Sequence, residues 1–249
     1  MIYIIGAGPG AEDLITVRGQ NLLKRADMVI YAGSLVNVEL LKQCPAGCEL
    51  LDSARMTLDE VIAALERADG EDKVIVRLHS GDPSIYGAIR EQMDELDARG
   101  MAYEVVPGVS SLNAAAAALR AEYTLPGVSQ TVIVTRMAGR TSVPERESVR
   151  SLAAHGATMV LFLSTGMLSE LCAELMAGGY AADTPAALVY HASWPDEAVV
   201  RGTLATLPEL ARGYTRTALV LVGGFMGDEY LKSRLYAPDY SHCYREARK

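Results

Sequence analysis

Short runs of aliphatic and β-branched residues alternate with longer helix-like segments through the first half of the chain. The alternation predicts parallel strands joined by crossover helices. Thr57, followed by Glu60 three residues later, predicts a capping box at the start of one helix. Strands are expected at residues 2–5, 28–31, 74–78 and 103–106, and helices at residues 13–25, 35–42, 57–68, 85–99 and 110–120.

The pattern changes in the second half, where strands outnumber helices. Strands are expected at 131–135, 159–163, 186–190, 198–202 and 218–222, with helices at 165–177 and 204–212. The short spacing between residues 186–190 and 198–202 favours an antiparallel hairpin. We therefore expect an α/β protein of two α/β domains. Residues 1–116 would carry a largely parallel sheet with glycine loops and residues 117–249 a mixed sheet, the boundary falling near residues 114–125.

Composition narrows the function classes. Half of the 249 residues are hydrophobic and the formal net charge is −8, which argues against nucleic acid as the main partner. No apolar run is long enough to span a bilayer and no signal-peptide pattern opens the chain, so we expect a cytoplasmic protein without a membrane partner. Cys44 and Cys48 lack further ligands at metal-binding spacing, so we expect no metal site.

The first glycine loop, Gly-Ala-Gly-Pro-Gly at residues 6–10, follows the first strand. Gly6, Gly8 and Ala11 fit the relaxed dinucleotide pattern, and the alternative is a tight strand-to-helix turn. Pro9 removes an amide donor where a phosphate-binding helix should begin. The second strand also ends at residues 31–33 without the acidic residue that would bind ribose.

Two further loops follow predicted strands. In residues 79–83, Ser80 and Gly81 allow close backbone approach. Asp82 either accepts hydrogen bonds from a ligand or caps the following helix. The hydroxyls of the third loop, residues 107–111, cap the next helix, contact a ligand, or do both. In an open parallel sheet the crevice beyond the strand ends is the ligand site, so the three loops predict where a cofactor binds.

Two histidines end strand patterns, one in each half. His79 is the first candidate for a catalytic base and His191 the second, each against the alternative of a structural histidine. No Ser-His-Asp order or zinc-ligand string is present in the sequence.

In this order the three loops resemble the motifs of the tetrapyrrole (corrin/porphyrin) methyltransferases. Residues 3–10 resemble the family's opening motif, residues 77–87 its Gly-Asp-Pro motif and residues 105–111 its third, and the likeness extends over the whole chain. Residues 31–36 and 239–242 resemble one branch, the C-11 methyltransferases of precorrin-4 and cobalt-precorrin-4.

The resemblance implies S-adenosyl-L-methionine as methyl donor, bound in a cleft between two α/β domains, S-adenosylhomocysteine as product, a tetrapyrrole substrate and a homodimer. Ser80 departs from a glycine common in relatives, and Leu163 and Ala192 depart from methionine and glycine in some. Carried over by position, the family's cofactor contacts fall on Pro9, Ser80, Gly81, Asp82, Ile85, Ser110, Ser111, Leu163 and Ala192.

Because the macrocycle carries many carboxylates and this chain is acidic, a local Arg or Lys cluster is expected beside the site. Three alternatives stay open. They are a methyltransferase of the same fold acting on another tetrapyrrole, a modified protein histidine or ribosomal RNA; a nicotinamide-dependent oxidoreductase; and a tetrapyrrole carrier without catalysis.

Overall fold

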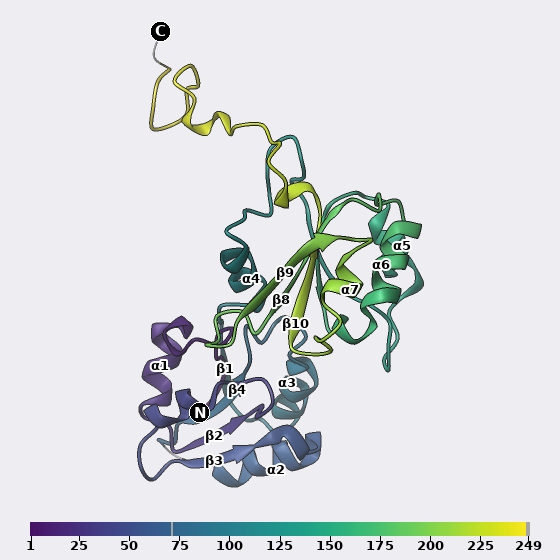
Figure 1. The fold of residues 1–249 in the computed structure, drawn as a ribbon. Coiled ribbons are helices and arrows are strands. Elements are labelled where there is room, and N and C mark those ends of the chain that lie inside the picture. The colour runs from purple at the N-terminus through teal and green to yellow at the C-terminus, as the bar shows by residue number, and fades with distance from the viewer. Residues whose placement is uncertain (71, 248–249) are drawn as a thin grey trace. The chain divides into compact units, whose positions relative to one another are not determined.

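The computed structural model describes residues 1–70 and 72–247 (Figure 1). The chain forms two compact units, each with its own sheet. The first unit comprises Met1–Ala115 together with His191–Ala198, and the second comprises Ala116–Tyr190 and the chain from Val199 onward. The sequence places residues 191–198 with the second half, so their assignment to the first unit is a feature that strand spacing does not reveal.

The sheet of the first unit is entirely parallel, as predicted. Its order is β3 (Glu49–Asp52), β2 (Met28–Tyr31), β4 (Ile75–His79), β1 (Ile2–Gly6) and β5 (Tyr103–Val106). The register pairs Gly6 with His79, so the loops after β1 and β4 leave the sheet at the same edge.

Helices cover both faces of this sheet. Leu22 and Leu23 of α1 (Val17–Leu23) pack into the core on one face. On the other face the core contains residues of α2 (Leu58–Ala68) and Leu96 of α3 (Ile89–Ala98). The capping box of α2 is present, with the Thr57 side chain accepting from the Glu60 N–H and the Glu60 carboxylate accepting from the Thr57 N–H.

Several element boundaries differ from the sequence prediction. Residues 12–14 and Val38–Gln43 form 3-10 turns where α-helix was expected, and β3 was not predicted. Helix α3 begins at Ile89 instead of residue 85 because Tyr86 and Ala88 adopt positive φ angles of 55° and 49°. An α-helix cannot pass through two left-handed residues.

The second unit contains the mixed sheet that was predicted. Its order is β6 (Val132–Arg136), β7 (Thr158–Phe162), β10 (Ala218–Val222), β8 (Pro185–Tyr190) and β9 (Ala198–Thr203). β6 runs parallel to β7, while β10 runs antiparallel to both β7 and β8. β8 and β9 are neighbours, as the predicted hairpin requires.

One core cluster joins this sheet to its helices. It includes residues of α5 (Val149–Ala153), α6 (Leu168–Ala177) and α7 (Leu207–Leu210), which lie on one side of the sheet in Figure 1. Helix α4 (Ser111–Leu119) crosses the division between the units. Among the described residues, no helix is both long and apolar enough to cross a membrane.

Candidate functional site

Three loops of the first unit meet at three glycines. A Cβ on Gly6 would lie 2.5 Å from the Gly81 carbonyl oxygen and 2.6 Å from Gly108 Cα, and one on Gly108 would lie 2.7 Å from Gly6 Cα. Gly8 and Gly81 also exchange two backbone hydrogen bonds, of 3.2 and 2.8 Å. The loops after β1, β4 and β5 therefore form one assembly that only glycine permits at these positions.

Asp82 fastens the second loop to the third. Its carboxylate accepts hydrogen bonds from the Gly108 N–H (2.8 Å), the Ser84 N–H (2.9 Å) and the Ser84 hydroxyl. Burial alone would raise the pKa of this carboxyl group, but these hydrogen bonds outweigh burial and lower its pKa. Asp82 does not cap α3, whose N-cap residue is Ala88 and has no side-chain hydrogen bond.

The N-terminus of α4 lies beside the second loop. The Ser110 carbonyl accepts the Asn113 N–H, so Ser110 immediately precedes the helix, and its side chain is buried. A Cβ on Gly81 would lie 3.6 Å from the Ser111 nitrogen. The first amides of a helix have no partner within it, so this arrangement places the N-terminal end of α4, with its Ser111 amide, beside Gly81.

The amides of the first loop are largely occupied by protein atoms. The Ala7 N–H donates to the His79 carbonyl (2.7 Å), the Gly8 N–H donates to Gly81, and Pro9 has no N–H. The Ala11 N–H donates to the Ser193 hydroxyl (3.0 Å). No α-helix starts at this loop, because a 3-10 turn follows and α1 begins only at Val17.

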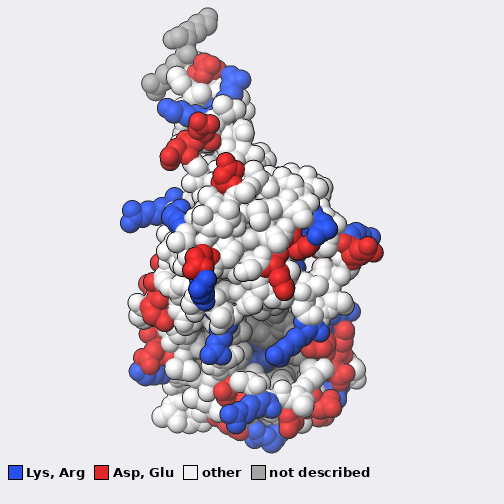
Figure 2. Space-filling model, turned by 45° about the vertical axis from the view of Figure 1, so that its right-hand side comes forward, with Lys and Arg blue, Asp and Glu red and all other residues white. Residues whose placement is uncertain are grey.

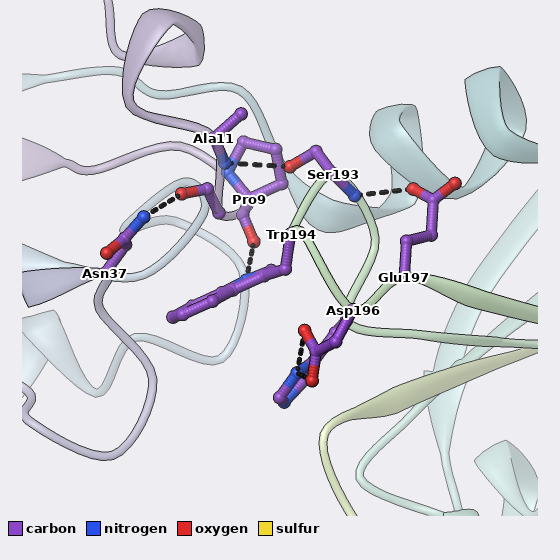
Figure 3. A network of polar contacts seen from close by, with 9 residues as sticks. Pro9, Ala11, Asn37, Ser193, Trp194, Asp196 and Glu197 are labelled. Carbon is purple, nitrogen blue, oxygen red and sulfur yellow. Dashed lines mark hydrogen bonds and ion pairs between the residues drawn. The ribbon is translucent and has the colours of Figure 1, made fainter. Parts of the chain in front are cut away.

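The segment His191–Ala198 lies against this loop within the first unit (Figure 3). The indole Nε1 of Trp194 donates to the Pro9 carbonyl (2.9 Å), and a Cβ on Gly10 would lie 2.8 Å from Trp194 Cγ. From the other side, the Asn37 side chain donates to the Gly10 carbonyl (2.9 Å). Residues 9–11 are thus held by side chains from two distant parts of the sequence.

The two candidate histidines have different surroundings. His79 is 5% exposed, and burial, together with the neighbouring Arg77 guanidinium, lowers its pKa to about 3. His191 has a φ angle of 45°, and its Nδ1 lies 3.0 Å from both carboxylate oxygens of Asp196. Only His191 has a carboxylate to orient its ring.

Comparison with known proteins identifies the family. The sequence profile of the Tetrapyrrole (Corrin/Porphyrin) Methylases matches residues 1–208, well over half of the chain. The chain belongs to this family. Its members use S-adenosylmethionine as methyl donor, so the chain is a methyltransferase, as the family resemblance implied.

Relatives of known function align with this methylase over 95–100% of its length. A cobalt-precorrin-4 C(11)-methyltransferase of Methanocaldococcus jannaschii is 49% identical over 100% of this chain and 97% of its own length. A precorrin-4 C(11)-methyltransferase of Rhodococcus erythropolis is 49% identical, covering 95% of this chain and 96% of its own.

Solved structures share the fold. A cobalt precorrin-4 methyltransferase, described as a cobalamin biosynthetic enzyme, superposes with a TM-score of 0.88 at 47% identity, covering 90% of this chain and 95% of its own. A uroporphyrin-III C-methyltransferase from Thermus thermophilus, solved with S-adenosylhomocysteine, has a TM-score of 0.73 at 28% identity, covering 89% and 96%.

The methylase has eight of its nine predicted cofactor residues in the first unit. Direct contacts join the loops that carry Pro9, Gly81, Asp82, Ser110 and Ser111, and the Ile85 N–H donates to the Asp82 carbonyl. Ala192 lies in the His191–Ala198 segment. Leu163 belongs to the second unit, follows β7, is 68% exposed and has a φ angle of 54°.

Sequence reasoning missed Asn37, Ser193 and Trp194. Trp194 is the only tryptophan of the chain, which is the one signal that could have singled it out. A groove of about 450 Å³ between residues 165–170 and 205–215 of the second unit contains none of the predicted cofactor residues. We therefore place the candidate site at the loop assembly, where the family motifs and the close backbone contacts coincide.

On the face shown in Figure 2, basic and acidic side chains are intermixed, and neither forms a separate charged patch. The expected Arg or Lys cluster for the substrate carboxylates remains a prediction. Within residues 1–70 and 72–247, no three His, Cys, Asp or Glu side chains come together as a metal site would need.

Proposed function

We propose that this methylase transfers a methyl group from S-adenosylmethionine to C-11 of precorrin-4 or cobalt-precorrin-4, a step of cobalamin biosynthesis. The observation that carries the proposal is identity of 49% over nearly the full length of two proteins so named. One relative's name includes cobalt and the other's does not, so both macrocycles are candidate substrates.

The proposed cofactor site comprises Pro9, Ser80, Gly81, Asp82, Ile85, Ser110, Ser111, Leu163 and Ala192. The loop assembly fits such a group because Gly81 leaves the second loop without a side chain beside the α4 N-terminus. Asp82 fixes that loop against Gly108. The cofactor supplies an activated methyl group on a sulfonium, and these residues would bind and orient it.

Positioning would supply much of the rate. Holding two reactants in line is worth up to about 7–11 kcal/mol of the barrier. His79 is a poor general base because a group with a pKa of about 3 seldom accepts a proton at neutral pH. For any proton transfer at the macrocycle we propose His191, whose ring Asp196 orients.

Two further features belong to the proposal. The family resemblance supports a homodimer, which light scattering of the purified protein tests. It also supports a cytoplasmic location, which fractionation of the producing cells tests.

The nicotinamide alternative has little support in the first loop. Its Gly6, Gly8 and Ala11 pattern requires free amides and a helix N-terminus facing a pyrophosphate. Here the Ala7, Gly8 and Ala11 amides bond protein oxygens, and α1 begins at Val17.

Ligand-induced stabilisation tests the cofactor. A ligand at 100 times its dissociation constant stabilises a protein by about 2.7 kcal/mol. S-adenosylhomocysteine should raise the unfolding midpoint and NADH should leave it unchanged. The reverse result would refute the proposal.

Mass spectrometry tests the acceptor. Incubation with S-adenosylmethionine and either precorrin-4 or cobalt-precorrin-4 should add the mass of one methyl group, with a uroporphyrin III-type macrocycle as the control. Methylation of the control alone would reassign the chain to another tetrapyrrole.

A further inference from the structure

The segment His191–Ala198 connects two strands of the second sheet, yet its contacts place it in the first unit. Two consecutive residues of the segment, Ser193 and Trp194, form hydrogen bonds to the first loop. Trp194 Nε1 binds the Pro9 carbonyl at 2.9 Å, and Ser193 Oγ accepts the Ala11 N–H at 3.0 Å. Between these bonds the indole lies against Gly10, where a Cβ would fall 2.8 Å from Trp194 Cγ, so any side chain at this position would displace the indole.

Contacts between residues of the segment hold it in its conformation. The Glu197 carboxylate accepts the Ser193 N–H at 2.6 Å, and the His191 ring stacks on the indole with centroids 5.2 Å apart and an interplanar angle of 29°. His191 and Ser193 have positive φ angles of 45° and 71°. Non-glycine residues keep such conformations only where surrounding contacts require them, and they concentrate at functional sites.

We propose that Trp194 is a positioning residue for the methyl-donor site. Its N–H fixes the Pro9 carbonyl and its ring fixes Gly10, so the tryptophan sets the place of Pro9 without itself needing to contact the cofactor. The inference rests on the proposed function, because Pro9 is one of the cofactor residues proposed above.

The proposed role of Trp194 follows from the missing backbone N–H at Pro9. Pro9 has no N–H, and its carbonyl is the only backbone hydrogen-bonding group it offers. The indole N–H uses that acceptor. Loss of the donor would remove the hydrogen bond to the Pro9 carbonyl, while Asn37 would still bond the Gly10 carbonyl and Ser193 the Ala11 N–H.

The test compares Trp194→Phe, which keeps an aromatic ring and removes the donor, with Tyr180→Phe. Tyr180 is a matched control because its hydroxyl donates to the Ala157 carbonyl in the second unit, and neither residue is one of the nine proposed cofactor residues. Calorimetry gives the dissociation constant of S-adenosylhomocysteine, kinetics give KM for S-adenosylmethionine and for the macrocycle, and thermal unfolding gives stability.

Trp194→Phe should weaken S-adenosylhomocysteine binding by about three- to tenfold, the range expected for one hydrogen bond, and leave the macrocycle KM within about twofold. Tyr180→Phe should lower stability without changing cofactor affinity. In the wild type, emission from this sole tryptophan should change saturably on titration with S-adenosylhomocysteine.

Three outcomes overturn the inference. Unchanged affinity in Trp194→Phe, with a wild type that binds, overturns the inference and leaves the proposed function intact. Equal weakening by Tyr180→Phe overturns it too, since the effect would then be one of general stability. A wild type that does not bind S-adenosylhomocysteine refutes both the inference and the proposed function.

Discussion

The buried imidazole of His79 lies at the end of β4, and its Nε2 has no hydrogen-bond partner among the described residues. Its pKa of about 3 is far below the value of about 6.5 for an unfolded chain. Between these values the unfolded state binds a proton that the folded state does not. Acid therefore favours unfolding, and stability falls as pH drops below 6.5.

We predict that replacing this imidazole removes that pH dependence. Relative to His79→Gln, the wild type should lose up to about 2 kcal/mol of stability between pH 7 and pH 5. Urea unfolding at several pH values measures the difference. His155→Gln, at an exposed position, is the control and should follow the wild type. Parallel curves for the wild type and His79→Gln would contradict the prediction.

At the scale of elements, the close approach of the three loops depends on Gly6 and Gly108. An alanine at 108 would bring its Cβ 2.7 Å from Gly6 Cα, where backbone must shift. We expect Gly108→Ala to cost about 1–3 kcal/mol, as overpacking does, and to weaken S-adenosylhomocysteine binding because Asp82 bonds the Gly108 N–H.

Gly47→Ala is the matched control for this substitution. Nothing lies within 4 Å of a Cβ at Gly47, so its stability and affinity should equal those of the wild type. Denaturant midpoints and calorimetry report both quantities. If Gly108→Ala behaved like Gly47→Ala, the loops would not need this close contact.

Elements with strong local signals were predictable. The strand at residues 28–31 has its predicted bounds, and Thr57 with Glu60 marks the start of α2 correctly. β3 was missed because Glu-Leu-Leu-Asp contains no β-branched residue and lies mostly exposed at the sheet edge. The start of α3 was misplaced because no residue preference foretells left-handed angles at Tyr86 and Ala88.

At the scale of the whole molecule, the sequence predicts two sheets and a cofactor site on loops that follow strands. Short-range periodicity determines strands, and motif order determines which loops to choose. Neither carries information about Trp194, which bonds Pro9 across 185 positions of sequence. Contacts of that range depend on the completed fold, so the bracing of the first loop was accessible only from the structure.

Removal of the C-terminal tail, from residue 233 onward, tests how much this segment contributes to the stability of the protein. In residues 233–247 the hydrogen bonds of the side chains run within the tail. Arg245, for example, donates to the carbonyls of Leu235 (2.8 Å) and Ala237 (2.7 Å). Leu231, just before it, bonds the Pro126 carbonyl at 2.9 Å and lies against Gly127.

Truncation after Lys232 should therefore leave the melting temperature within about 2 °C of the wild type, since no core residue of the described structure lies beyond Phe225. It should also retain S-adenosylhomocysteine binding, because none of the nine proposed cofactor residues lies beyond Lys232. Truncation after Gly227, which also removes Leu231, should lower the melting temperature further. Scanning calorimetry of the two truncated proteins decides the matter, and equal losses in both would show that the tail itself stabilises the second unit.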